Sequence, residues 1–327
     1  MTAQPKPAVL LLAHGSPESA DDVPEFLKYV TGGRPLPPAV VEEVKHRYRL
    51  IGPSPLTRIT MKQGELLARA IKLPVYVGMR NWQPFIPDVV GRMKQDGTER
   101  AVAICLAPQN SRTSVGLYRQ ALFAPRQATD PAQAGESNQA PFAVEFVDNW
   151  HDHPLLVKAF AERLAAGWKR ACEEAGARVP IIFTAHSVPQ HTILEGDPYE
   201  AQARETAALV AMQVPSITVD DWAFAFQSQG MSGGAWLGPA VEEAILGLKA
   251  RGHRTVFIQP VGFLCDHVEV LYDIDIMFRD FAAREGMKLW RAESLNDSLT
   301  LVAALADVVR SRLYPEGAPQ VVQIATK

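Results

Sequence analysis

The sequence predicts an α/β fold with two similar domains, each built on a four-stranded parallel sheet, that face each other across a cleft. Three observations carry this prediction: the chain length, eight short apolar runs separated by helical patterns, and an internal repeat. The chain has 327 residues, and at roughly 150 residues per domain this length predicts two domains. Apolar residues make up 47% of the chain and charged residues 21%, which argues against disordered, collagen-like and coiled-coil classes.

The predicted strands form two sets of four. The first set covers residues 8–13, 74–78, 101–107 and 142–147, and the second covers residues 180–185, 222–226, 255–259 and 287–291. Their hydrophobicity is continuous, as in parallel strands covered on both faces. Helical spacing of apolar residues from His153 to Gly176 predicts a helix that bridges the domains. We therefore expect domains at 1–150 and 151–327, with an insertion at about 20–55 in the first.

Two parts of the chain repeat each other. The strand VLLLAHGSP at Val9 and the strand IIFTAHSVP at Ile181 both end in Ala-His, with a proline three residues after the histidine. Trp82 and Trp236 each begin the same order of proline, amphipathic helix, Lys, Gly, Arg, strand and proline. Ligands of open α/β sheets bind beyond the carboxyl ends of the strands, so the polar residues found there are expected to line the cleft.

The net charge and the motifs that the sequence lacks exclude several classes of function. Thirty-three Lys and Arg against thirty-six Asp and Glu give a net charge of −3, which argues against a broad nucleic-acid-binding surface. The chain lacks a P-loop, a GxGxxG after a strand, a GxSxG elbow and an HExxH motif, so nucleotide, dinucleotide and serine-hydrolase chemistry lose weight. No segment approaches the ~20 apolar residues of a membrane helix. Three distant cysteines support neither a disulfide framework nor a four-cysteine metal site, so the expected compartment is the cytoplasm.

Three residues of the second half are suited to proton transfer or metal binding. His186 directly follows a predicted strand, where an imidazole can act as general base or metal ligand; the alternative is that its ring caps the turn. Glu269 and Asp273 lie one helical turn apart, so they could pass protons or a hard divalent cation; the alternative is a solvated helix face. His267 is expected to project elsewhere if this helix starts earlier.

The insertion carries residues suited to a large ligand with peripheral acids. If it folds over the cleft as a lid, Arg34 and Arg47 would clamp carboxylates bidentately; the alternative is that they solvate a surface helix. Further hydroxyl groups would add neutral hydrogen bonds, namely those of Ser54, Ser111, Thr113, Ser114 and Tyr118.

The order of motifs along nearly the whole chain resembles the ferrochelatases. The second half carries AHSVP, then GDPY at 196–199, FQSQG, WLGP at 236–239 and PVGFLCDHVEVLYD, and the first half carries GGRP at 32–35, Arg47-Tyr48, Ile51-Gly52 with SPL, and LAPQNSRTSV. This resemblance implies two Rossmann-like, chelatase-type domains with a porphyrin between them and insertion of Fe2+, a substrate, to make a haem. It implies no prosthetic group, and without a cysteine-rich C-terminal extension we expect no iron–sulfur cluster.

The resemblance also assigns site residues. The family's catalytic histidine and glutamate fall on His186 and Glu269, which would contact the metal or take the pyrrole protons, and Asp273 would continue a proton or metal path. Porphyrin contacts are implied for His14, Arg34, Arg47, Tyr48, Ser54, Ser111, Thr113, Ser114 and Tyr118. Two positions depart from the family pattern: His14 stands where members acting on coproporphyrin commonly carry tyrosine, and Met277 where a further carboxylate would be expected.

The AHGSP segment and the arginines of the insertion favour coproporphyrin III as substrate, since its four propionates exceed the two of protoporphyrin IX. The expected product is then Fe-coproporphyrin (coproheme). Three alternatives stay open: a protoporphyrin IX ferrochelatase making protohaem, a sirohydrochlorin chelatase, and a non-catalytic tetrapyrrole carrier. The EVLYD and QSQG segments argue against the sirohydrochlorin alternative. The expected partners are the porphyrin and Fe2+, with transient partners from the haem pathway and no nucleic acid.

Overall fold

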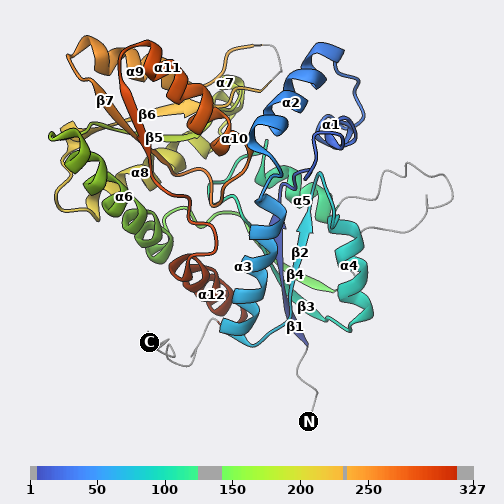
Figure 1. Cartoon of the computed structure of the whole chain (residues 1–327). Helices are drawn as coiled ribbons and strands as arrows, with labels where there is room; N and C mark the ends of the chain where they lie inside the picture. Colours follow the sequence, from blue (N-terminus) through green and yellow to red (C-terminus); the bar gives the residue numbers. More distant parts are fainter. Residues whose placement is uncertain (1–5, 124–141, 231–233, 315–327) are drawn as a thin grey trace.

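Two separate parallel sheets form the framework of the protein (Figure 1). The computed structural model describes residues 6–123, 142–230 and 234–314. The first sheet has the order β2-β1-β3-β4 and the second the order β6-β5-β7-β8. The strands are β1 (Pro7–Ala13), β2 (Val75–Met79), β3 (Arg100–Cys105), β4 (Ala143–Val147), β5 (Ile181–His186), β6 (Trp222–Gln227), β7 (Thr255–Pro260) and β8 (Lys288–Arg291).

The strand predictions are confirmed, with every observed strand end within two residues of the predicted one. The two sheets have the same order of strands, as the internal repeat predicts, and all pairings between neighbouring strands are parallel. The middle strands are almost fully buried because helices cover both of their faces, which explains their continuous hydrophobicity. The predicted residues 315–327 of the second domain lie outside the described residues.

Helices of the first half are α1 (Val23–Val30), α2 (Pro38–Ile51), α3 (Leu56–Ile71), α4 (Ile86–Gln95) and α5 (Val115–Phe123). Those of the second half are α6 (Pro154–Ala175), α7 (Gln190–Leu194), α8 (Tyr199–Met212), α9 (Val241–Ala250), α10 (Val268–Leu271), α11 (Arg279–Arg284) and α12 (Leu299–Leu313), with a short 3-10 turn η2 (Val219–Asp221) and a π-helical segment η3 (Asp273–Phe278).

Helix α6 begins and ends where the sequence predicts. The His153 ring accepts a hydrogen bond from the backbone N–H of Leu155 at 3.3 Å, and Pro154 occupies the first turn, where its missing N–H costs nothing. Gly176 ends the helix in the left-handed conformation, with φ of 63°.

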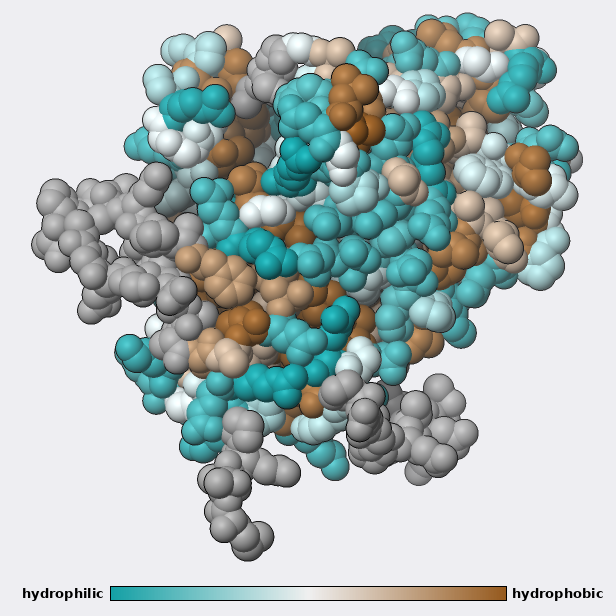
Figure 2. All heavy atoms as spheres, turned by 180° about the vertical axis from the view of Figure 1, so that it is seen from behind, coloured by the Kyte–Doolittle hydropathy of each residue, from teal (hydrophilic) through white to brown (hydrophobic). Residues whose placement is uncertain are grey.

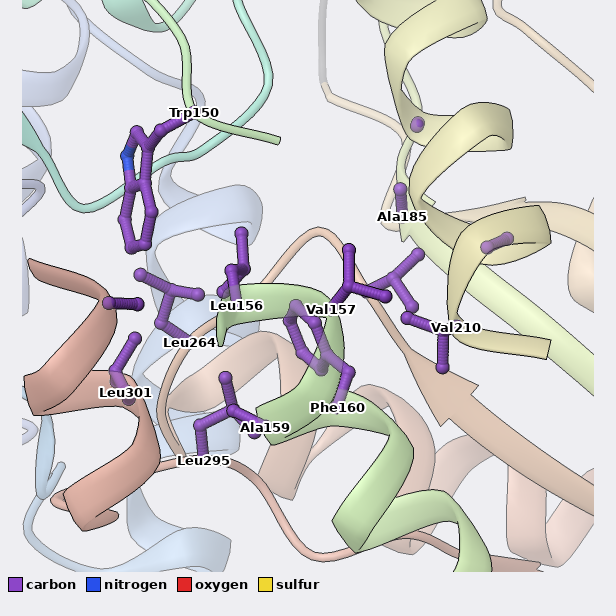
Figure 3. Close-up of a cluster of buried hydrophobic side chains, with 14 of the residues drawn as sticks. Trp150, Leu156, Val157, Ala159, Phe160, Ala185, Val210, Leu264, Leu295 and Leu301 are labelled. Carbon is purple, nitrogen blue, oxygen red and sulfur yellow. The ribbon is translucent and has the colours of Figure 1, made fainter. Parts of the chain in front are cut away.

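A single apolar core joins the two halves. Helix α6 packs on β7, β8 and α8, and also on α12, which in turn packs on α3 and β3 of the first half. The C-terminal helix therefore returns to the first sheet, and the predicted bridging role of α6 is shared with α12. Figure 3 shows this junction, where Leu156 and Phe160 of α6 lie near Leu301 of α12 and near Leu264 and Leu295 from the loops after β7 and β8.

The insertion forms the helices α1 and α2, which pack against each other at one side of the molecule (Figure 1). Its apolar side chains, including Phe26 and the buried Tyr48, form a small core of their own. That core also contacts Trp82 of the first half and Val268, which begins α10 of the second half. The insertion therefore lies against both halves where the carboxyl ends of their strands approach each other.

The surface shown in Figure 2 is mostly hydrophilic, and its hydrophobic residues lie in small separate patches. None of the helices within residues 6–123, 142–230 and 234–314 combines the length and the apolar character needed to span a membrane.

Candidate functional site

The two repeated Ala-His segments end the central strands in the same local geometry. His14 follows β1 and His186 ends β5, and in each ring Nδ1 contacts the carbonyl oxygen of the next residue. The backbone beyond each strand is tightly packed. A Cβ on Gly15, which has φ of +81°, would lie 2.8 Å from the backbone nitrogen of Trp82, and one on Gly262 would lie 2.9 Å from the Cβ of Ala185. Glycine is therefore required at both turns.

Glu269 lies between two histidines. Its Oε1 is 3.4 Å from Nε2 of His186, and its Oε2 is 3.4 Å from Nε2 of His267. Helix α10 begins at Val268, so the earlier helix start that would have turned His267 elsewhere does not occur, and His267 faces Glu269. The side-chain amide of Gln227, at the end of β6, donates to the backbone carbonyl of Glu269 at 2.8 Å and fixes the start of α10.

Hydrogen bonding and charge favour an ion pair between His186 and Glu269. Burial would lower the pKa of His186, but the charge of Glu269 and the hydrogen bonds of the ring raise it above the usual value of 6.5. Burial would raise the pKa of Glu269, but the two histidines lower it well below 4.5. Both neighbours of the His186 ring, the Ser187 carbonyl and the Glu269 carboxylate, are acceptors, so both ring nitrogens are satisfied when both carry protons.

His14 has the opposite character. Burial, followed by the positive charge of Arg80, lowers its pKa to about 4. One ring nitrogen faces the Gly15 carbonyl, and the other lies 2.9 Å from the side-chain nitrogen of Asn81. One acceptor and one donor suit a neutral imidazole. The repeat therefore supplies one charged and one neutral histidine at equivalent strand ends.

The site lies where the two halves meet. The charge of Glu269 affects the pKa of His14, Tyr48 and Tyr118 from the first half, so all three lie within electrostatic reach of it. The side chains of His186 and Glu269 are 31% and 35% exposed, although surrounding protein strongly perturbs their pKa values. Both side chains are therefore partly exposed beyond the carboxyl ends of parallel strands, which is where ligands of open α/β sheets bind.

Asp273 is buried beside this pair. It begins η3, and the hydroxyl of Ser228 donates a hydrogen bond to its Oδ2. Burial, followed by the charge of Glu269, raises the pKa of Asp273 to about 6. Its Oδ1 accepts no hydrogen bond from the part of the chain that the structure describes and lies 3.7 Å from Nη1 of Arg47. Single-turn π-helical segments are frequent at functional sites because they redirect side chains within a helix.

Some residues of the insertion contact the site and others lie away from it. The half-buried Arg47 lies 4.9 Å above the Tyr272 ring and 3.1 Å from Glu43, in addition to its contact with Asp273. The hydroxyl of the buried Tyr48 pairs with Ser16 at 2.8 Å. Arg34 is exposed in the loop after α1 and donates to the carbonyl of Thr31 at 3.2 Å. The hydroxyl of Ser54 is buried without a hydrogen-bond partner.

The loop before α5 is fixed from the other half. Asp197 accepts hydrogen bonds from the Ser111 hydroxyl at 3.0 Å and from the Arg112 backbone at 2.8 Å. Ser111 is fully buried, and its hydroxyl also pairs with that of the exposed Thr113 at 2.9 Å.

Ser114 directly precedes α5 and Tyr118 lies in its first turn. Among the described residues, the buried Ser114 hydroxyl and the buried Nε of Arg80 have no hydrogen-bond partner. The guanidinium of Arg80 lies 5.7 Å from the centre of the Tyr118 ring.

Four residues of this site have contacts that the sequence did not predict. They are His267 beside Glu269, Ser228 beside Asp273, and Arg80 and Asn81 beside His14. Each follows the end of a strand, which is the available signal, but their partners come from distant segments. Within the part of the chain that the structure describes, no group of three or more His, Cys, Asp and Glu side chains is arranged to hold a metal ion.

The fold is that of the chelatases with two α/β domains. Two solved structures of SirB from Bacillus subtilis, one with Fe3+ and one described as a sirohydrochlorin chelatase in complex with cobalt, match 94% of this chain with TM-scores of 0.56 and 0.51. Their sequence identities to it are 13% and 12%, so this likeness concerns the fold alone.

Sequence comparison identifies the family. The ferrochelatase family model matches residues 6–313. A ferrochelatase of Acidobacterium capsulatum is 53% identical, covering 96% of this chain and 97% of its own length, and one of Deinococcus radiodurans is 37% identical, covering 95% and 98%. The chain belongs to the ferrochelatase family, whose members are lyases that insert a metal ion into a porphyrin.

Replacing Asp273 with asparagine tests the pKa of this carboxyl group. Its folded-state pKa of about 6 lies above the usual 3.8, so the folded chain binds its proton more tightly than the unfolded chain, and ionisation of Asp273 lowers stability as the pH rises through this range. We expect Asp273→Asn to raise the free energy of unfolding by about 1–3 kcal/mol at a pH of about 7.5, and the difference to vanish near pH ~4.

Urea denaturation at both pH values measures this difference. The matched control is Asp21→Asn, at an exposed position, with an expected change below about 0.5 kcal/mol at either pH. A stabilisation by Asp273→Asn that is the same at both pH values would contradict the assigned pKa.

Proposed function

We propose that this enzyme inserts Fe2+ into coproporphyrin III, with His186 and Glu269 at the centre of the macrocycle. The observation that supports this most directly is the His186–Glu269 pair, 3.4 Å apart, partly exposed to solvent and within electrostatic reach of His14 and Tyr48 from the first half. A relative in Geobacillus kaustophilus that is named coproporphyrin III ferrochelatase is 34% identical over 94% of this chain.

The reaction requires two pyrrole N–H protons to leave as Fe2+ sheds water and binds the four nitrogens. The products are the iron porphyrin and two protons, so the reaction needs no oxidant, reductant or prosthetic group. In the ion pair, Glu269 is the ionised group and His186 already carries a proton. Glu269 is therefore the first group able to accept a proton or to attract the cation, and an arriving dication would favour loss of the His186 proton by repulsion.

Asp273 extends this chemistry away from the ring. Burial is the largest cause that raises the pKa of Asp273 to about 6, and the nearby charge of Glu269 is the second. With this pKa, Asp273 exchanges protons readily near neutral pH. We propose that protons, or the incoming cation, pass between Glu269 and Asp273.

His14 faces the site from the first half and is neutral near pH 7, since its pKa is about 4. We propose that it contacts the porphyrin from the first half, with Asn81 holding its ring in place at 2.9 Å.

The periphery supports a ligand with several carboxylates. Arg47 and Tyr48 come from α2 and Ser54 follows it, whereas Ser114 precedes α5 and Tyr118 lies in it. The buried hydroxyls of Ser54 and Ser114 have no hydrogen-bond partner among the described residues, and such groups cost free energy unless a ligand satisfies them. Coproporphyrin offers four propionates to such groups, whereas protoporphyrin offers two. Arg34 is exposed in the loop after α1, so it would contact a propionate only at the outer edge of the porphyrin site.

Removal of either member of the central pair tests the proposal. We expect His186→Ala and Glu269→Gln each to lower kcat for Fe2+ insertion by at least about a hundredfold, because positioned acid–base groups contribute on that order. Porphyrin binding, followed by fluorescence, should change by less than about threefold, since the propionates carry much of the affinity. The matched control is His191→Ala, at an exposed histidine of α7, which should leave kcat unchanged.

Anaerobic assays with coproporphyrin III, protoporphyrin IX and sirohydrochlorin in parallel separate the alternatives. Fastest turnover with protoporphyrin IX would contradict the substrate proposal. A carrier would bind the tetrapyrrole without metallating it, and full turnover in His186→Ala would reject the catalytic assignment.

Arg47 tests the choice of porphyrin. We expect Arg47→Ala to weaken binding of coproporphyrin III by about tenfold and that of protoporphyrin IX by about twofold or less, because a charged hydrogen bond to a propionate contributes about 1.5–3 kcal/mol. Arg49→Ala, on the same helix but exposed and paired with Glu42, is the control and should change neither affinity. Equal weakening of both porphyrins by Arg47→Ala would contradict a propionate contact.

A further inference from the structure

Behind the site lies a buried polar cluster that the reaction chemistry does not use. Its centre is Arg291, the last residue of β8, whose side chain is 12% exposed. The guanidinium donates from Nε to Oδ1 of Asp275 and from Nη2 to Oδ2 of the same residue, both at 2.8 Å. Nη2 also lies 3.5 Å from Oδ1 of Asp266. A planar fork of this kind fixes the orientation of its carboxylate as well as its position.

The two carboxylates belong to the two segments that carry the catalytic groups. Asp266 directly precedes His267 and stands three residues before Glu269, in the loop after β7. Asp275 lies in η3, two residues after Asp273. Arg291 is therefore the point where the loop that places Glu269 and the segment that places Asp273 are joined.

Asp266 is held from a third direction. It accepts hydrogen bonds from the Ser294 hydroxyl at 2.7 Å and from the Asn296 side chain at 2.9 Å, and its own backbone N–H donates to Oδ1 of Asn296 at 2.9 Å. Asn296 adopts the left-handed conformation, with φ of 48°, and its backbone carbonyl accepts a hydrogen bond from Gln63 of α3 at 2.6 Å. The cluster thus ties the Glu269 loop to the first half as well.

The neighbouring apolar side chains fix the same two loops from the other side. Leu264, two residues before Asp266, and Leu295, between Ser294 and Asn296, are buried in the core that joins the halves (Figure 3). The backbone N–H of Asn296 donates to the carbonyl of Leu264 at 2.8 Å. The loop after β7 is held between this core and Arg291.

We propose that Arg291 is a positioning residue for metal insertion, which acts through Asp266 on Glu269 and through Asp275 on Asp273. The inference rests on the proposed roles of Glu269 and Asp273. A π-helical segment has weaker local preferences than an α-helix, so an external anchor decides where its side chains point. The bidentate contact with Asp275 is that anchor. Within the described residues, the side-chain partners of Arg291 are Asp275, Asp266, Ser294 and the carbonyl of Ala292, so its effect on Glu269 and Asp273 is indirect.

The test compares Arg291→Met and Arg291→Lys with a control at Arg163. Arg163 pairs with Glu293, two residues beyond Arg291, through an exposed contact at 2.9 Å, so Arg163→Met removes a nearby arginine ion pair without touching the cluster. Initial rates are measured against Fe2+ and against whichever porphyrin the wild type metallates fastest. We expect Arg291→Met to lower kcat/KM for Fe2+ by about 10–100-fold, as loss of a group that orients metal-site side chains commonly does, with KM for porphyrin within about twofold of wild type.

Lysine keeps the charge but not the fork, so Arg291→Lys should fall between wild type and Arg291→Met. Thermal unfolding of each variant gives the folded fraction, to which all rates are normalised. If Arg291→Met does not fold, Arg291→Lys decides: a loss of at least about threefold in kcat/KM for Fe2+ supports positioning, and wild-type kinetics overturn it.

Other outcomes also reject the inference. Normalised kinetics of Arg291→Met within about twofold of wild type would leave Arg291 a purely structural residue, and so would equal losses in Arg291→Met and Arg163→Met. A wild type that metallates no porphyrin would instead reject the proposed function, so the two failures are distinguishable.

Discussion

The contact of one carboxylate with two imidazoles organises this protein. Glu269 is held 3.4 Å from both His186 and His267, in surroundings where an isolated carboxylate would be too costly to keep ionised. Positive charge on the histidines offsets that cost and lowers the pKa of Glu269, and the ionised Glu269 in turn raises the pKa of His186 and Asp273. The chemistry of this site therefore depends on keeping the Glu269 side chain in place.

The fold supplies that placement through duplication. Two sheets with the same strand order direct the carboxyl ends of their strands toward a common region, and α6 and α12 join them through one core. The equivalent histidines have diverged in their surroundings. His186 contacts two acceptors and favours the charged form, whereas His14 lies between a carbonyl and an amide N–H and is neutral. Duplication has thus produced two unlike groups from one local geometry.

Periodicity and turn residues predicted the eight strands, helix α6 and the repeat because these features depend on local sequence. Proximity to strand ends likewise singled out His186 and Glu269, and the structure brings them together. The remaining contacts depend on distant partners. Nothing near Arg47 in the sequence indicates that it reaches Asp273, and nothing near Ser111 indicates that its hydroxyl donates a hydrogen bond to Asp197. An α-helical period does not predict the π-helical geometry of η3 either. The contact of His267 with Glu269 depends on where α10 begins, and the Gln227 amide that binds the backbone of Glu269 lies far away in the chain.

A crystal structure of the protein with a metal-free porphyrin bound tests the proposed site most directly. We expect the pyrrole nitrogens to lie next to His186 and Glu269, with His14 contacting the macrocycle from the first half and propionates near Arg47 or Ser114. A porphyrin bound elsewhere on the molecule, or one whose centre lies away from the His186–Glu269 pair, would contradict it.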